Sequence, residues 1–199
     1  MNRIIPIIAA GLVVFSATQT SMAVKHTVIR GDTMWKIASQ YKVGTKEIIQ
    51  ANPQVRNPDL IFPGEILEVP QISSYVRTYE ERVVELVNQH RSRNGLSPLS
   101  INWELSRVAR IKSQDMADNR YFSHNSPTYG TPFQMMKSFG IKYNTAGENI
   151  AYGQATPEEV VSAWMNSTGH RQNILNNQYT QIGIGYFSKG NYWTQLFIG

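Results

Sequence analysis

Cysteine is absent from all 199 residues of the sequence, and charged residues are scarce at 17%. The missing thiols exclude disulfides, a cysteine nucleophile and a lipid-modified N-terminal cysteine. Low charge combined with 41% hydrophobic residues excludes a wholly disordered chain and predicts globular domains with cores of their own. The formal net charge of +5 is mild and its basic residues are scattered, which argues against nucleic-acid binding.

The first 23 residues differ from the rest because Arg3 is their only charged residue. Residues 4–15 are an unbroken apolar run, too short to span a bilayer, and small residues follow at Ser21 and Ala23. We expect residues 1–23 to be a secretory signal peptide cleaved before Val24, with no transmembrane span afterwards. A retained membrane anchor is the alternative. An exported chain without disulfides must rely on its core, which fits the exterior of a Gram-positive bacterium.

Residues 24–70 predict a small β-α-α-β unit. The expected order is a strand at 26–29, a helix at 34–41, a second helix at 45–51 and a closing strand at 65–69. Asp32 or Thr33 can cap the first helix, and Asn52-Pro53 ends the second.

The stretch VIRGDTMWKIASQYKVGTKEIIQANPQVRNPDLIFPGEILEVP resembles a LysM domain over its whole length. The resemblance implies binding of N-acetylglucosamine-containing glycans, above all peptidoglycan and chitin. The implied groove lies between the turn after the first strand and the loop before the last one. Its residues in this sequence are Gly31, Asp32, Thr33, Met34, Asn52, Pro53, Leu60 and Ile61. Asp32 and Thr33 can alternatively serve only as helix caps, and Ile61 only as core.

A linker at 71–79 separates this unit from a second module at 80–199. The second module predicts helices at 78–93 and 102–120, two helices opened by capping boxes at Thr131 and Thr156, and strands at 180–187 and 192–198. Helices combined with a terminal hairpin predict an α+β sandwich.

Three polar side chains of the second module stand in segments predicted to be loops or turns. They are His124 in YFSHNSP, Glu148 in AGENIAYG and His170 in NSTGHRQN. Glu148 has no charged residue or histidine within five positions on either side, so its partner must come from elsewhere in the chain. Two imidazoles and one carboxylate form a common zinc set. The other interpretation is a hydrogen-bonded network that positions loops, and spacing alone does not bring the three together.

The segments LVNQHRSRNGLSPL, YFSHNSP, AGENIAYG, VSAWMNSTGHRQNIL, QIGIGYF and YWTQLFIG occur in this order. Together they resemble a CAP-superfamily domain of the SCP or pathogenesis-related-1 type, in its bacterial exported form. The resemblance implies an α-β-α sandwich with a cleft lined by two histidines and two acidic residues. His124, Glu148 and His170 match three of the four. Gln134 stands near the fourth position, where it neither ionises nor acts as a general base.

The two resemblances imply an exported protein of the cell wall or spore envelope, from a Gram-positive spore former. Its LysM module would hold peptidoglycan, and its CAP module would bind a ligand, a metal such as zinc on His124 and His170, or an envelope or coat protein. CAP domains generally lack an established enzymatic activity. The alternatives are a metal-dependent hydrolase of wall or coat material with Glu148 as general base, and a purely structural module. The missing second acid and the lack of a Gly-x-Ser-x-Gly elbow count against the hydrolase.

Overall fold

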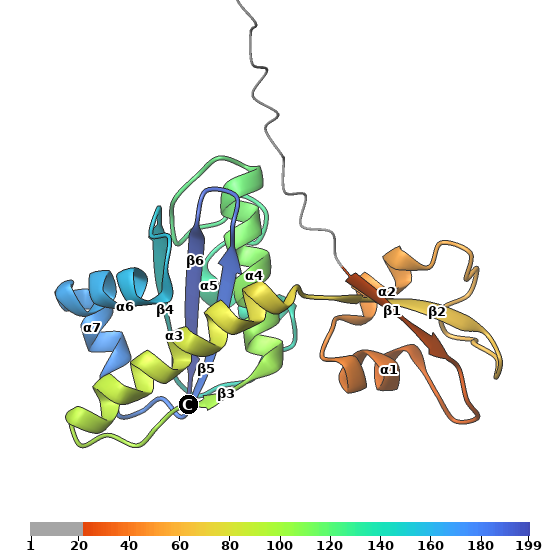
Figure 1. Ribbon diagram of the computed structural model, residues 1–199, viewed down its shortest axis with the longest axis horizontal. Coiled ribbons are helices and arrows are strands. Elements are labelled where there is room, and N and C mark those ends of the chain that lie inside the picture. Colours follow the sequence, from red (N-terminus) through yellow and green to blue (C-terminus); the bar gives the residue numbers. More distant parts are fainter. Residues whose placement is uncertain (1–21) are drawn as a thin grey trace, which may run out of the picture.

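The computed structural model describes residues 22–199, so residues 1–21 of the predicted signal peptide lie outside the described part. Two modules lie side by side, an N-terminal module of residues 22–71 and a larger C-terminal module of residues 74–199 (Figure 1). Within residues 22–199, no helix is long and apolar enough to cross a membrane.

The N-terminal module has the predicted β-α-α-β order. Strands β1 (Met22–Thr27) and β2 (Ile66–Gln71) pair antiparallel, and helices α1 (Met34–Tyr41) and α2 (Thr45–Ala51) pack on them. Both helices have their predicted bounds, because local signals define their ends: the Thr33 side chain accepts the Lys36 N–H at the start of α1. The strands differ from prediction. Strand β1 begins at Met22, four residues before the predicted start, and ends at Thr27, two residues before the predicted end. Strand β2 begins one residue later than predicted, at Ile66, and continues two residues further, to Gln71.

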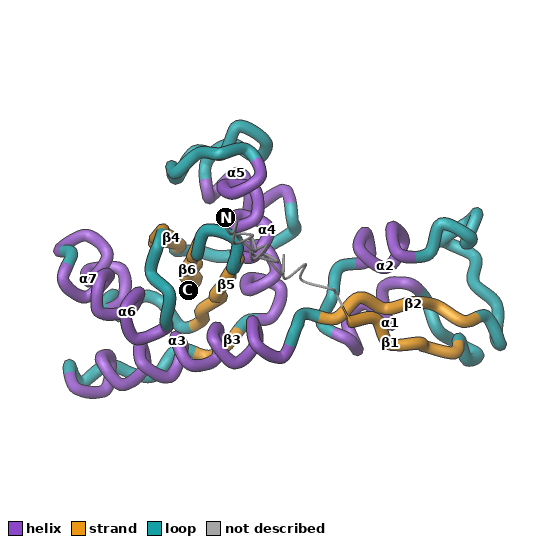
Figure 2. The backbone as a smooth tube through the Cα atoms, turned by 45° about the horizontal axis from the view of Figure 1, so that its top comes forward, coloured by secondary structure: helices purple, strands orange, loops and turns teal. Residues whose placement is uncertain are grey.

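The C-terminal module is an α-β-α sandwich, as predicted (Figure 2). Its elements are α3 (Ser74–Arg93), β3 (Ser100–Ile101), α4 (Trp103–Asp118), α5 (Pro132–Ser138), β4 (Ala146–Tyr152), α6 (Pro157–Asn166), α7 (Thr168–Ile174), β5 (Gln181–Phe187) and β6 (Tyr192–Ile198). The sheet order is β3-β5-β6-β4, with β3 parallel to β5 and the other pairs antiparallel. One apolar core joins the sheet to α3 and α6, and a second joins it to α4 and α5.

Helix α4 lies unusually close to the sheet. A Cβ atom on Gly183 or Gly185 of β5 would collide with the α4 backbone at Leu105 and Ala109. Only glycine permits this approach, which brings the polar side chains of α4 near the strands that carry the candidate site.

Three local expectations are corrected by the structure. Helix α3 begins at Ser74 with Ser73 as its N-cap, so most of the expected linker at 71–79 is helical. His170 lies in the short helix α7 and not in a loop. At Thr156 the capping box is incomplete, because Glu159 accepts the N–H of Ala155 instead of returning to Thr156.

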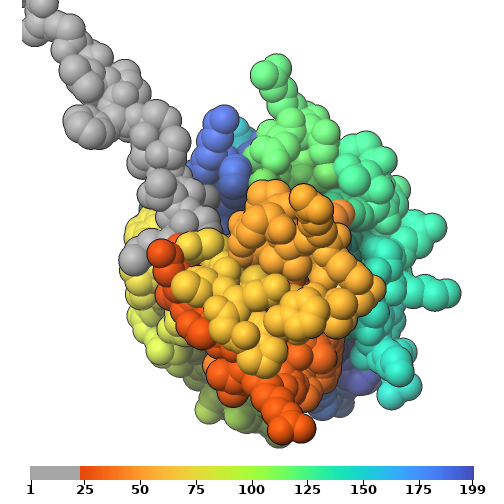
Figure 3. All heavy atoms as spheres, turned by 90° about the vertical axis from the view of Figure 1, so that its right-hand side faces the viewer, coloured from red at the N-terminus to blue at the C-terminus, as the bar shows by residue number. Residues whose placement is uncertain are grey.

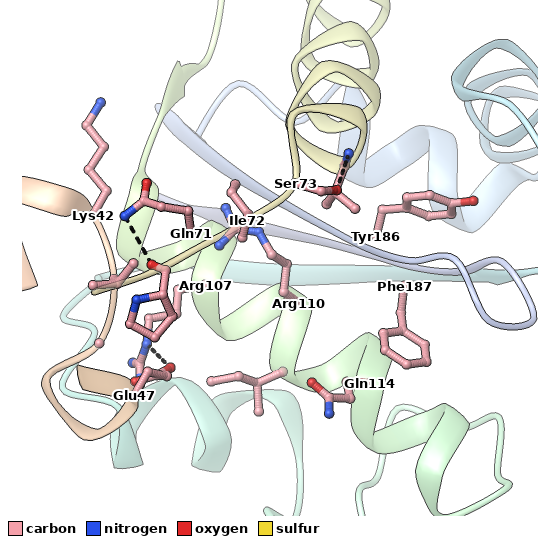
Figure 4. Close-up of a pocket in the computed structure, with 15 residues that line it drawn as sticks. Lys42, Glu47, Gln71, Ile72, Ser73, Arg107, Arg110, Gln114, Tyr186 and Phe187 are labelled. Atoms are coloured by element: carbon pink, nitrogen blue, oxygen red, sulfur yellow. Dashed lines mark hydrogen bonds and ion pairs between the residues drawn. The ribbon is translucent and has the colours of Figure 1, made fainter. Parts of the chain in front are cut away.

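The two modules meet through a two-residue connector, Ile72-Ser73, and through side chains from α2 and α4. In the view turned by 90°, the N-terminal module, coloured red to orange, lies in front of the C-terminal module (Figure 3). Between them is a cleft of about 310 Å³, lined by the connector, α4 and the end of β5 (Figure 4). Arg107 of α4 reaches across its wall to Glu47 of α2 (Figure 4).

Candidate functional site

Glu148 has its partner in His124. Strand β4 pairs Glu148 with Leu196, so its side chain points to the α4 side of the sheet, where only 3% of it is exposed. The loop after α4 brings the His124 Nδ1 atom to 2.6 Å from Glu148 Oε1. The imidazole itself is about half exposed, at 52%. The isolated carboxylate of the sequence is therefore buried beneath an accessible histidine.

His170 joins the same site from the other side of β4. Together with His124 and Ile150 it lines an open cleft of about 480 Å³, whose other lining residues are Phe122, Ser123 and Asn125. Helix α7 is held against β4 by amide contacts: Asn149 Nδ2 donates to the His170 carbonyl oxygen at 3.1 Å, and Asn173 Nδ2 donates to Asn149 Oδ1 at 2.8 Å. The two histidines predicted from the sequence thus line one cleft, and the predicted glutamate lies beneath it in contact with His124.

The electrostatics of the cleft follow from burial. Desolvation raises the pKa of Glu148, while the hydrogen bond with His124 and the nearby Lys112 charge act in the opposite direction. Desolvation, together with the charge of His124, lowers the pKa of His170. His170 is therefore predominantly a neutral imidazole at pH 7.

Two buried charged residues of α4 support the loop that carries His124, and sequence reasoning missed both roles. Lys112 Nζ donates to the Tyr121 hydroxyl at 2.9 Å and to the carbonyl oxygens of Ser123 and His124 at 2.8 and 3.1 Å. The position of Lys112 on the apolar face of the predicted helix could have indicated this role, because a buried lysine requires hydrogen-bond partners.

Asp115, one turn further along α4, holds the second half of the same loop. Its carboxylate accepts the hydroxyls of Ser126 at 2.6 Å and Thr128 at 2.7 Å, and also the hydroxyl of Tyr121. Burial opposes ionisation of Asp115, but the hydrogen bonds outweigh it and lower its pKa. The carboxylate is therefore charged at neutral pH and fixes residues 121–128 over the cleft.

Gln134, near the fourth position implied by the family resemblance, caps α5. Its Oε1 accepts the Thr131 N–H at 2.8 Å, and its own N–H donates to Thr131 Oγ1 at 3.2 Å. The capping box predicted here is complete. Because its side chain is committed to this box, it contributes no acidic or metal-ligating group to the cleft.

The donor atoms at the cleft fall short of a zinc site. Among residues 22–199, no three His, Asp or Glu side chains are arranged to hold a metal ion. Glu148 is directed at His124 Nδ1, where a carboxylate orients an imidazole instead of serving as a third ligand. The imidazoles of His124 and His170 alone do not make the three-ligand set of a zinc centre. Zinc at this cleft stays a prediction.

The second candidate site is the groove predicted in the N-terminal module. Its two sides are joined at the base, where Val28 N–H donates to the Glu65 carbonyl oxygen and Gly64 N–H donates to that of Val28. The turn with Gly31 and the loop with Leu60 and Ile61 therefore lie side by side.

The predicted groove residues divide into exposed and structural ones. Gly31, Thr33, Pro53 and Leu60 are exposed, and Ile61 is half-buried against the core of the module. Met34 and Asn52 are buried, so their side chains have no access to a ligand. Asn52 instead ties α2 to β2, donating to the Ile48 and Glu68 carbonyl oxygens, each at 2.7 Å.

Asp32 closes the turn of the groove. Its Oδ2 accepts the Ile29 N–H at 2.9 Å and lies 2.9 Å from His26 Nε2. The backbone hydrogen bond from Ile29, followed by the His26 contact, lowers the pKa of Asp32. The sequence reasoning missed the exposed apolar residues beside this turn, Ile29 and Phe62, which are 64% and 54% exposed. Their position next to turns in the sequence could have indicated that these hydrophobic side chains are exposed.

Comparisons with known proteins agree with both modules. The profile of the cysteine-rich secretory protein family, CAP, matches residues 84–197, and the LysM domain profile matches residues 26–70. The Bacillus subtilis protein YkwD is 65% identical over 126 residues, which cover 63% of this chain and 49% of YkwD. SpoIVD-associated factor A of Bacillus subtilis is 46% identical over 52 residues, or 26% of this chain and 13% of that protein.

Solved structures support the same assignment. The crystal structure of an extracellular protein containing a SCP domain from Bacillus anthracis aligns with a TM-score of 0.60 at 33% identity, covering 68% of this chain and 47% of that one. This chain spans about half the length of both YkwD and the Bacillus anthracis protein. The LysM match supports binding of peptidoglycan or a related N-acetylglucosamine glycan, and the CAP match indicates an extracellular protein. The chain belongs to the cysteine-rich secretory protein family, and its CAP domain follows a LysM domain.

Proposed function

We propose that this protein is retained on the cell wall or spore envelope by its LysM domain and there presents the CAP cleft of His124, Glu148 and His170 to a ligand or partner. The observation that carries this proposal is the joining of a glycan-binding type of domain to a CAP domain by only two residues, Ile72-Ser73. A connector this short keeps the CAP cleft close to whatever glycan the LysM domain holds.

The surface of the LysM groove supports contact with a sugar. Ile29, Leu60 and Phe62 are 64%, 55% and 54% exposed around the turn closed by Asp32. Exposed apolar side chains grouped at a turn are typical of a binding site. They can cover the ring faces and acetamido methyl groups of a glycan, while backbone groups of the turn bind its polar edges.

The setting proposed for the protein follows from its charge and its relatives. The formal charge is +5 for the full sequence and +4 once Arg3 leaves with the predicted signal peptide, and it favours attraction to anionic wall polymers. A likeness to the spore coat assembly protein ExsA of Bacillus cereus, 44% identical over 52 residues, supports a spore envelope, with the vegetative wall as the other setting. Partners among envelope or coat proteins would be met there. Self-association would add avidity to a single LysM copy.

Co-sedimentation with purified peptidoglycan tests the proposal. We expect the protein to pellet with peptidoglycan and the double variant Leu60→Ala, Phe62→Ala to remain in the supernatant. Both side chains are exposed, so the fold should tolerate their loss. Phe133→Ala, which removes an equally exposed aromatic from the CAP domain, is the matched control and should pellet like the parent. Pelleting of the double variant at the parent level would exclude this surface as the glycan contact.

A hydrolytic role is the second candidate, and the pairing of His124 with Glu148 at 2.6 Å favours it. An imidazole oriented by a buried carboxylate is suited to remove a proton from water. The residues that line the cleft add no second carboxylate, so this activity would depend on the pair alone. Release of soluble muropeptides from peptidoglycan, abolished in Glu148→Gln, would establish it.

A further inference from the structure

Three aromatic side chains form a continuous row at one end of the CAP cleft. Phe122 comes from the loop after α4, Tyr152 from the end of β4 and Tyr192 from the start of β6. Ring centroids are 6.2 Å apart for Phe122 and Tyr152, and 4.5 Å apart for Tyr152 and Tyr192. Phe122 and Tyr152 are each 53% exposed, so the row presents aromatic surface to solvent. These segments meet at the end of the sheet where the β5–β6 hairpin turns (Figure 1).

The row is held in place by the hairpin. Tyr152 and Tyr192 are cross-strand partners, and the Gly153 N–H donates to the Asn191 carbonyl oxygen at 3.0 Å. Gly190 has φ +93°, and a Cβ atom there would press into the Tyr192 ring. The Tyr192 ring therefore lies directly against the turn. An exposed aromatic surface fixed by backbone contacts loses little conformational entropy when a ligand stacks on it.

The row continues directly into the cleft, because Phe122 lines it together with His124 and His170. The remaining polar lining, Ser123 and Asn125, is uncharged. Neither lysine nor arginine lines this cleft. The nearby carboxylate of Glu148 is only 3% exposed and is engaged by His124. The fitting ligand is therefore neutral, with apolar faces for the rings and hydroxyl or amide groups at its edges.

We propose that Phe122 and Tyr152 form a saccharide subsite of the CAP cleft, which takes an uncharged N-acetylated pyranose ring of a wall glycan. The ring faces stack on Phe122 and Tyr152, and its hydroxyl and acetamido groups meet Asn125 and the two imidazoles. A wall peptide fits less well, because its carboxylates find no cationic side chain among the lining residues. This inference rests on the proposed function, since the LysM domain would bring the glycan to the cleft.

Residue-resolved NMR of the mature chain, titrated with an N-acetylglucosamine tetramer, tests the subsite. We expect two separate groups of shifted amides, one around the LysM turn and one around Phe122, Tyr152 and His170. Tyr152→Ala should weaken the second group's binding about fivefold to tenfold, the loss expected for one aromatic stacking contact, and leave the first unchanged. Tyr152→Phe keeps the ring and should bind like the parent, and so should Phe133→Ala.

The outcomes separate this inference from the proposed function. Shifts confined to the LysM domain would overturn the subsite and leave wall retention intact. Shifts at the CAP cleft without LysM shifts would support the subsite and count against retention by LysM. A Tyr152→Ala variant with a native spectrum and unchanged CAP shifts would overturn the subsite. A sugar-free wall peptide that reproduces the CAP shifts when the tetramer does not would also overturn it.

Discussion

Arg107 of the CAP domain grips Glu47 of the LysM domain with two hydrogen bonds, from Nε at 2.6 Å and from a terminal nitrogen at 2.7 Å. The guanidinium also lies 5.2 Å from the Phe139 ring centroid, so it is fixed from both sides. The two side chains are only 18% and 33% exposed. Two domains on a connector are expected to move relative to each other unless contacts between them prevent it. A bidentate, partly buried ion pair between the domains limits this motion.

We expect Arg107→Gln to release the LysM domain. In ¹⁵N relaxation measurements the parent should show one rotational correlation time for both domains, and the variant a shorter time for the smaller one. The loss in free energy of unfolding should be about 1 kcal/mol, as for a well-aligned but partly exposed pair. Arg82→Gln breaks the exposed pair with Glu158 inside the CAP domain and should leave the tumbling unchanged. If both domains of Arg107→Gln keep one rotational correlation time, the connector alone holds the two domains rigidly together.

The His124 loop should depend on Asp115. Asp115→Asn removes the charge that accepts the hydroxyls of Ser126 and Thr128, and we expect a loss of about 2 kcal/mol in the free energy of unfolding. Amide hydrogen exchange should accelerate over residues 121–130 more than elsewhere. The control is Asp118→Asn on the same helix, an exposed residue whose exchange pattern should match the parent. Uniform protection in Asp115→Asn would show that the loop is held without this carboxylate.

Much of the fold was predictable because its signals are local. The bounds of α1 and α2 follow from the cap at Thr33 and the stop at Asn52-Pro53, and the capping box at Thr131 formed as expected. Helix α3 begins four residues before the predicted start at Thr78, because the polar residues ahead of Thr78 favour a linker in the sequence. The structure shows instead that Ser73 caps the helix there.

The site was less predictable, because it is assembled by tertiary contacts. No spacing rule joins His124 to Glu148; their contact depends on the loop being folded back by Lys112 and Asp115. The sequence predicts a loop where α7 lies, because this helix has only seven residues and no side-chain cap. Amide contacts from β4 stabilise it. The family resemblance supplied the grouping of His124, Glu148 and His170 that spacing could not.

Glu80 should make stability depend on pH. It is buried beside Arg110, whose Nε lies 2.9 Å from its Oε1, yet desolvation outweighs this contact and raises the pKa of Glu80 from 4.5 to about 7. Between these values the folded state keeps a proton that the unfolded chain has released. The free energy of unfolding should therefore fall as pH rises from 4.5 to about 7 and lose this dependence above it.

Glu80→Gln tests this through the slope. The variant loses the ion pair with Arg110, so its free energy of unfolding falls at every pH. The part of the pH dependence that the Glu80 carboxyl contributes between pH 4.5 and about 7 should disappear. Urea unfolding at pH values below, within and above this window measures it. Glu85→Gln, an exposed residue on the same helix, should keep the parent slope. An unchanged slope in Glu80→Gln would show that Glu80 is ionised throughout.

Zinc titration by calorimetry, on the mature chain at neutral pH, decides what the CAP cleft can hold. With two converging imidazoles and no third ligand within residues 22–199, we expect weak one-to-one binding that His170→Ala abolishes. Glu148→Gln should weaken it about tenfold or more without abolishing it, because that carboxylate acts on zinc through His124 Nδ1. If Glu148→Gln removes binding as fully as His170→Ala, the carboxylate is itself a ligand. If the parent binds no zinc, the cleft acts through its hydrogen bonds alone.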